Sequence, residues 1–153
     1  MKHFGISALL ILLAACAPQD VVPGKSSARF NEYPTQLFDI FELACDGPAY
    51  TFNRPEKDIY ECRELLPPPE AAATILAYDG YPEDLPQLVI RFSASQSAPG
   101  YVVDAELFLN VPQKKGLAQR VVPGDPRINR KMSSLLRMAG GVPVAPDVPA
   151  DPG

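Results

Sequence analysis

Histidine is almost absent from this chain: of 153 residues, only His3 is one. Histidine is the general base of Ser-His-Asp and Cys-His mechanisms and a common zinc ligand. The chain beyond residue 3 therefore excludes these mechanisms and any histidine metal site. It also lacks a glycine-rich phosphate-binding loop. The sequence thus predicts a protein with no catalytic site, no metal site and no cofactor.

Long apolar runs and an excess of positive charge are also missing. The apolar stretch from Phe4 to Leu13 spans about ten residues, whereas a membrane-spanning helix needs about 20. The 14 lysines and arginines face 18 acidic residues, which gives a net charge of −4. Because an acidic chain is a poor match for a polyanion, we expect no nucleic-acid partner.

The short apolar run instead has the form of an export signal. Lys2 and His3 precede it as a basic segment, and Leu13-Ala14-Ala15-Cys16 follows it. A basic start, a short apolar run and a small-residue cleavage site define a secretory signal peptide. An aliphatic residue and two small residues before a cysteine resemble the lipobox of bacterial lipoproteins. This resemblance covers about the first 17 residues.

The resemblance implies processing and an anchor. Residues 1–15 would be a signal peptide, cleaved between Ala15 and Cys16, and Cys16 would be lipidated. Each buried methylene contributes about 0.8 kcal/mol, so two or three acyl chains hold a protein on a membrane durably. Ala17 stands where an aspartate favours inner-membrane retention in such lipoproteins. We therefore expect the periplasmic face of the outer membrane, with the inner membrane or plain secretion as alternatives.

Two further cysteines remain, Cys45 and Cys62. The periplasm is oxidising, so an even pair favours a disulfide. Free thiols, a redox pair and a metal site are the alternatives. However, the two residues lack CxxC spacing, and two thiols without histidine make a poor zinc site. We predict a Cys45–Cys62 bridge that contributes about 3 kcal/mol by closing a loop of about 17 residues.

Residues 35–140 carry the patterns of a folded domain. Leu88 to Ser95 and Tyr101 to Val111 alternate in polarity, which is typical of antiparallel strands half exposed to water. Helices are predicted from Thr35 to before Gly47, at 71–78 and at 126–139, and strands at 50–52, 59–65, 88–95, 101–111 and 117–122. These elements predict an α+β fold: a small antiparallel sheet with about three helices packed on one face, and one disulfide.

The first predicted helix has an unusual distribution of apolar residues. Leu37, Ile40, Phe41 and Ala44 recur at the spacing of one helical face. Phe38 and Leu43 are also apolar but lie off that face. Such a helix is either deeply buried or partly a contact surface.

The segments on both sides of this domain lack periodicity. Residues 16–34 include Pro18, Pro23 and Gly24, which favours a lipidated flexible tether. Residues 141–153 carry a proline at every third position, which is the period of polyproline II. We interpret this stretch as a proline-rich disordered tail.

Positive charge is concentrated on the last predicted helix. Its apolar stripe comprises Ile128, Met132 and Leu135, and the cations must mostly point away from that stripe. This basic face is a candidate contact for anionic lipid headgroups or an acidic partner, and a solvated surface is the alternative. It consists of Arg127, Arg130, Lys131 and Arg137.

These observations predict a non-enzymatic, lipid-anchored protein with a binding or accessory role. Its expected partners are the membrane, through the N-terminal lipid, and another envelope protein. One alternative is a hydrolase of envelope polymers that uses paired carboxylates, such as Asp58 with Glu61 or Glu83 with Asp84. A periplasmic inhibitor of a specific enzyme is the other.

Overall fold

The computed structural model describes residues 22–144. The expected signal peptide, Cys16 and most of the expected proline-rich tail lie outside these residues. In chain order the elements are β1 (Lys25–Phe30), α1 (Thr35–Ala44), β2 (Tyr50–Glu56), β3 (Ile59–Leu65), α2 (Pro68–Tyr78), β4 (Gln87–Ser97), β5 (Gly100–Val111), β6 (Gln119–Val121), α3 (Pro126–Met138) and β7 (Val142–Val144). None of these helices is long and apolar enough to span a membrane.

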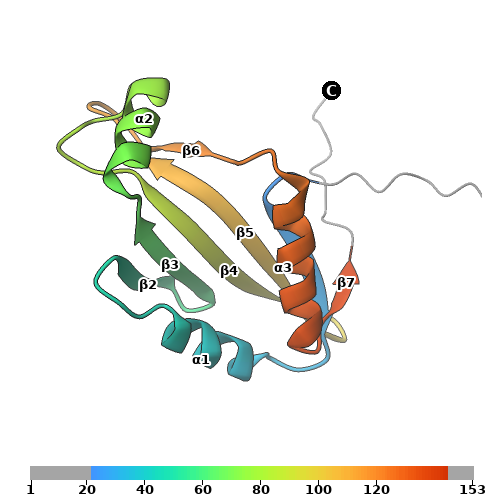
Figure 1. Cartoon of the computed structure of the whole chain (residues 1–153). Helices are drawn as coiled ribbons and strands as arrows, with labels where there is room; N and C mark the ends of the chain where they lie inside the picture. The colour runs from blue at the N-terminus through green and yellow to red at the C-terminus, as the bar shows by residue number, and fades with distance from the viewer. Residues whose placement is uncertain (1–21, 145–153) are drawn as a thin grey trace, which may run out of the picture.

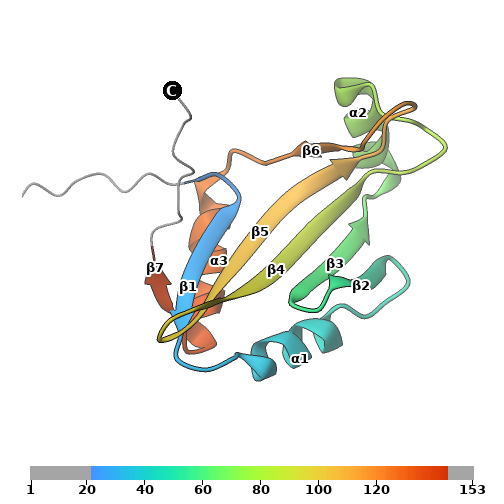
Figure 2. The same ribbon diagram turned by 180° about the vertical axis from the view of Figure 1, so that it is seen from behind.

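All the strands belong to one antiparallel sheet in the order β2-β3-β4-β5-β1-β7 (Figures 1 and 2). Strand β5 is its centre: β4 pairs along one side, while β1 and β6 share the other. The alternation in β4 and β5 places Phe92 opposite Ala105 and Arg91 opposite Glu106, on opposite faces. The predicted antiparallel sheet and α+β class are therefore confirmed.

The sheet is larger than the small sheet that we predicted. Residues 25–30, assigned to the tether, form β1 between β5 and β7. Residues 142–144, assigned to the tail, form β7. The sequence pattern does not indicate a strand at β1, because Ser26 and Ser27 occupy buried positions where apolar residues are expected. Their hydroxyls are bonded by partners about 80 to 100 residues away along the chain.

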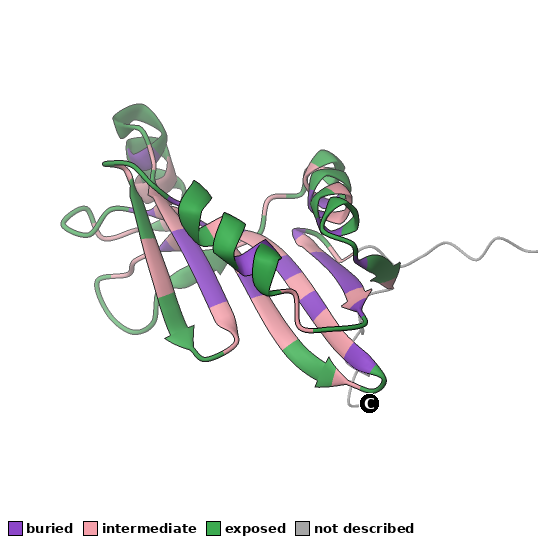
Figure 3. Cartoon of the chain, turned by 90° about the horizontal axis from the view of Figure 1, so that it is seen from below, coloured by how far each residue is buried: buried purple, intermediate pink, exposed green. Residues whose placement is uncertain are grey.

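Helices α1 and α3 cover one face of the sheet (Figure 1), and the side view shows buried strand positions beneath them (Figure 3). Phe38 of α1 stacks on Tyr60 of β3 with ring centroids 4.2 Å apart. Met132 and Leu136 of α3 are buried over the same core, beside Ala28 of β1. Burying such side chains contributes about 1.5–3 kcal/mol each.

The ends of the helices are fixed in different ways. The predicted Cys45–Cys62 disulfide is present and ties the end of α1 to β3. Asp125 caps α3 by accepting a hydrogen bond from the Arg127 backbone N–H, at 2.9 Å. Thr35, however, does not cap α1, which begins after Pro34 without a side-chain cap.

Helix α2 lies at the far end of β5 rather than beside α1 and α3 (Figure 1). Ala71 is its buried residue, whereas Leu76 is 85% exposed. The turn after it approaches β5 so closely that a Cβ on Gly80 would lie 2.9 Å from Val111 Cγ1. The turn after α2 is therefore held against Val111 of β5 by a close contact in which a larger residue than Gly80 would clash.

Candidate ligand-binding groove

A groove of about 340 Å³ runs between α1 and α3 on the helix-covered face. Ligand sites are typically concave, mostly apolar and about 300–1,000 Å³ in volume. The groove meets this description, because Gln36 is its one polar lining side chain. The lining residues are Gln36, Leu37, Ile40, Phe41 and Ala44 from α1, Phe92 from β4, and Leu135, Met138 and Ala139 from the end of α3.

The apolar stripe predicted on α1 forms one wall of this groove. Phe38, which lies off the stripe, is the residue that packs into the core and is 2% exposed. Ile40 on the stripe is 58% exposed, and Met138 on the facing helix is 81% exposed. Helix α1 is thus not deeply buried. Large apolar side chains left exposed beside a hollow mark a site that another apolar group can cover.

Both walls of the groove are held rigidly. Phe41 packs edge-on against Phe92, with ring centroids 4.7 Å apart. On the other side, buried Asn129 fixes α3 to the start of β1. Its Oδ1 accepts from the Gly24 N–H at 2.9 Å, and its Nδ2 donates to the Val22 and Lys25 carbonyls, both at 2.7 Å. The groove is therefore pre-formed.

The predicted basic face divides into two parts. Its four residues, Arg127, Arg130, Lys131 and Arg137, are all exposed. At 3.6 residues per turn, Lys131 shares the groove side of α3 with Leu135, while Arg130 and Arg137 point elsewhere. Arg127 is engaged with Asp125 at 2.8 Å. Lys131 is therefore the cation of this face that is unpaired within residues 22–144 and lies on the same side of α3 as the groove residue Leu135, one turn before it.

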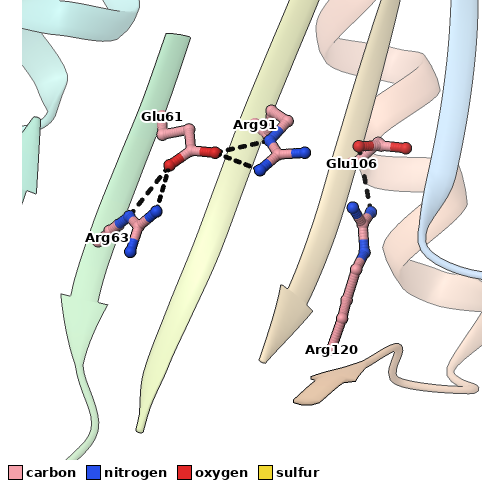
Figure 4. Close-up of polar contacts among 5 residues, drawn as sticks. All are labelled: Glu61, Arg63, Arg91, Glu106 and Arg120. Carbon is pink, nitrogen blue, oxygen red and sulfur yellow. Dashed lines mark hydrogen bonds and ion pairs between the residues drawn. The ribbon is translucent and has the colours of Figure 1, made fainter. Parts of the chain in front are cut away.

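The opposite face of the sheet has a different chemistry (Figure 4). Glu61 has a side chain only 1% exposed, and two arginines hold it. Arg63 donates to its Oε2 from Nε at 3.0 Å and from Nη2 at 2.7 Å, and Arg91 donates to its Oε1 from Nε at 2.7 Å. Beside them, Arg120 pairs with Glu106 at 3.1 Å. The figure shows these side chains side by side on neighbouring strands.

This arrangement keeps Glu61 ionised. Burial raises the pKa of Glu61, but the hydrogen bonds and positive charges of Arg63 and Arg91 outweigh that effect. Its pKa therefore lies below the ordinary value. A carboxylate held by two arginines is not available to donate a proton as a general acid. We interpret this cluster as structural.

The candidate carboxylate pairs do not face each other across a shared site. Asp58 accepts a hydrogen bond from the Tyr33 hydroxyl at 2.9 Å, whereas Glu61 is bound by arginines on the other side of β3. Glu83 accepts a hydrogen bond from Tyr81, and Asp84 is exposed next to it. Within residues 22–144, no group of acidic or cysteine side chains is arranged to hold a metal ion.

No protein-family model matches the chain, and no curated protein matches it significantly in sequence. The functional interpretation therefore depends on the geometry of the described residues and on the N-terminal motif.

Proposed function

We propose that this chain is a non-enzymatic, lipid-anchored binding protein of the bacterial envelope whose α1–α3 groove accepts an acyl chain. The observation that supports the proposal is the pre-formed, open groove, whose lining is apolar apart from Gln36. The lipobox resemblance at Leu13–Cys16 would place this groove beside a membrane. Cys16 would carry the anchor, and the outer membrane's periplasmic face is the proposed location.

An acyl chain fits the groove better than an extended peptide does. Before the last turn of each helix, the backbone groups of its α1 and α3 walls lie within helical hydrogen bonds, and Gln36 is the one polar side chain in its lining. A peptide would bury amide groups without partners, which costs about 1–3 kcal/mol for each group. An acyl chain has no such groups. Lys131 lies on the groove side of α3 and is suitably placed for an anionic headgroup.

A substitution in the groove wall tests the proposed ligand. In the mature chain carrying Cys16→Ser, we expect Leu135→Gln to weaken binding of the fluorescent fatty acid cis-parinaric acid about tenfold. A polar amide facing an acyl chain loses about 1–3 kcal/mol, and 1.4 kcal/mol corresponds to tenfold in affinity. Fluorescence titration measures the change.

Leu76→Gln is the matched control, because Leu76 is an 85% exposed leucine on α2, away from the groove. It should leave the affinity unchanged. Lys131→Gln should weaken binding of the anionic fatty acid, while Arg130→Gln should not. Equal affinities for Leu135→Gln and Leu76→Gln would contradict the acyl-chain proposal and favour a protein partner for this surface.

The anchor has its own test. Replacing Cys16 with serine in the full-length chain should abolish palmitate labelling and release the protein from the membrane fraction, because two or three acyl chains supply the attachment. Cys45→Ser serves as the control and should remain labelled. A Cys16→Ser protein that keeps both the label and its membrane association would refute the lipoprotein assignment.

A further inference from the structure

A second hollow, of about 350 Å³, is lined by side chains of β1, β4 and β5. Figure 2 shows these strands from the face of the sheet that α1 and α3 leave uncovered. The hollow's lining is polar, in contrast to the groove. Hydroxyl groups come from Ser27, Ser95 and Ser97, an amide from Gln96, and charges from Lys25, Arg29 and Asp104; Val102 and Val144 complete it. We propose that this hollow binds a hydroxylated carboxylate, such as a sugar acid, through the guanidinium group of Arg29.

The available edge of Arg29 supports this assignment. Its Nη1 donates to the Ser97 carbonyl at 3.0 Å and approaches the Ser97 hydroxyl at 3.4 Å. Among residues 22–144, no group accepts from its Nε or Nη2 and no carboxylate pairs with it. The Nε–Nη2 edge presents two parallel N–H groups that match a carboxylate.

Two other arginines of this face, Arg63 and Arg91, show what that edge binds. Arg63 directs its Nε and Nη2 at Glu61, and Arg91 does the same. Of these three half-buried arginines, only Arg29 has this edge open within the described chain. The nearby acid does not occupy it, because Asp104 is held by Lys25 at 3.0 Å and by the Ser27 hydroxyl at 2.5 Å.

The rest of the lining indicates the remainder of the ligand. Seryl hydroxyls and an amide both donate and accept hydrogen bonds, so they suit ligand hydroxyl groups. Arg29 lies on β1, which is paired on both sides by β5 and β7. The site is therefore held on a rigid element rather than on a loop. This inference is independent of the acyl-chain groove, which lies on the other face.

The chain itself offers one competitor. Val144 lines the hollow, and residues 145–153 beyond it, outside the described residues, contain Asp147 and Asp151. The experiment must therefore separate a free carboxylate from these side chains.

The test is titration of the mature Cys16→Ser chain with glucuronate, followed by nuclear magnetic resonance, including the Arg29 Nε–H signal. Glucuronate should shift that signal and glucose should not. Arg29→Lys keeps the charge but removes the fork, so it should weaken glucuronate binding at least tenfold. Arg130→Lys, an exposed arginine on α3, should leave it unchanged. Thermal unfolding checks that both variants are folded.

Three results would overturn the proposal. One is binding of glucose as strongly as glucuronate, since the hydroxyl groups alone would then be recognised. Another is no saturable binding by the full mature chain at millimolar glucuronate. The third is binding only by the Asp147→Asn/Asp151→Asn variant, which would assign Arg29 to the chain's own aspartates.

Discussion

Replacing Glu61 with glutamine should lower the free energy of unfolding by about 3 kcal/mol, because removing one partner of a buried ion pair leaves the others uncompensated. The Glu61 side chain is 1% exposed and accepts from two arginines. Without its charge, Arg63 and Arg91 would repel each other across adjacent strands. Both arginines are about one-third exposed, so water relieves part of this cost and the loss stays near the lower end expected for buried pairs.

The Glu61 carboxylate should also make the free energy of unfolding depend on pH. The folded pKa of Glu61 is below its ordinary value, because the arginine hydrogen bonds and charges outweigh burial. The unfolded state therefore takes up a proton first as the pH falls. The stabilisation is complete above the ordinary carboxyl pKa of about 4.3 and is lost as the pH falls through the lower folded value. Urea unfolding of the wild type and of Glu61→Gln between pH 7 and pH 3 should show that the difference between their free energies of unfolding shrinks below about pH 4.

Glu106→Gln is the matched control on the same face of the sheet. Glu106 pairs with Arg120, but that arginine is 40% exposed and the glutamate 18% exposed. Pairs of this kind contribute about 0–1 kcal/mol. If Glu61→Gln is as stable as Glu106→Gln at pH 7, the charge of Glu61 is not needed to compensate the charges of Arg63 and Arg91.

Local sequence patterns predicted where the helices and strands lie, but not what these elements contact in the folded protein. The alternation in residues 88–95 and 101–111 identified β4 and β5, because period two requires only local sequence. The stripe of Leu37, Ile40, Phe41 and Ala44 identified α1. It did not show that the stripe faces a groove, since that depends on the position of Leu135 and Met138 almost 100 residues later.

The unpredicted features depend on long-range polar contacts. Ser26 is buried in β1 because its hydroxyl donates to the Asn129 carbonyl at 3.0 Å, and Asn129 in turn fixes Gly24. No local pattern reveals such a partnership, so the sequence of residues 25–30 favours a tether over a strand. Glu61 looks like an ordinary surface residue until the sheet register brings Arg91 opposite it. Arg29 likewise becomes a candidate site only when β1 enters the sheet.

The chain-entropy model attributes about 3 kcal/mol to a disulfide that closes a loop of this length. Replacing both Cys45 and Cys62 with alanine should therefore lower the free energy of unfolding by about that amount. The bridge joins residues 17 positions apart in sequence. Urea unfolding measures the loss. Thiol alkylation of the denatured, unreduced wild-type protein should detect no free thiol from this pair.

The bridge should matter for the groove beyond its effect on stability. It anchors the end of α1 to β3, and α1 supplies one wall of the groove. Without the bridge, α1 is held by aromatic packing, with Phe38 stacked on Tyr60 and Phe41 edge-on against Phe92. We expect weaker cis-parinaric acid binding in the double variant, because a wall that moves no longer presents a pre-formed site.

Val111→Ala is the control for a general loss of stability. It creates a cavity at the other end of β5 and should destabilise the fold by about 2 kcal/mol. If Val111→Ala binds like wild type while the cysteine variant binds several-fold more weakly, the disulfide's contribution to binding is its hold on α1. Equal binding by both variants would instead show that the groove forms without the bridge.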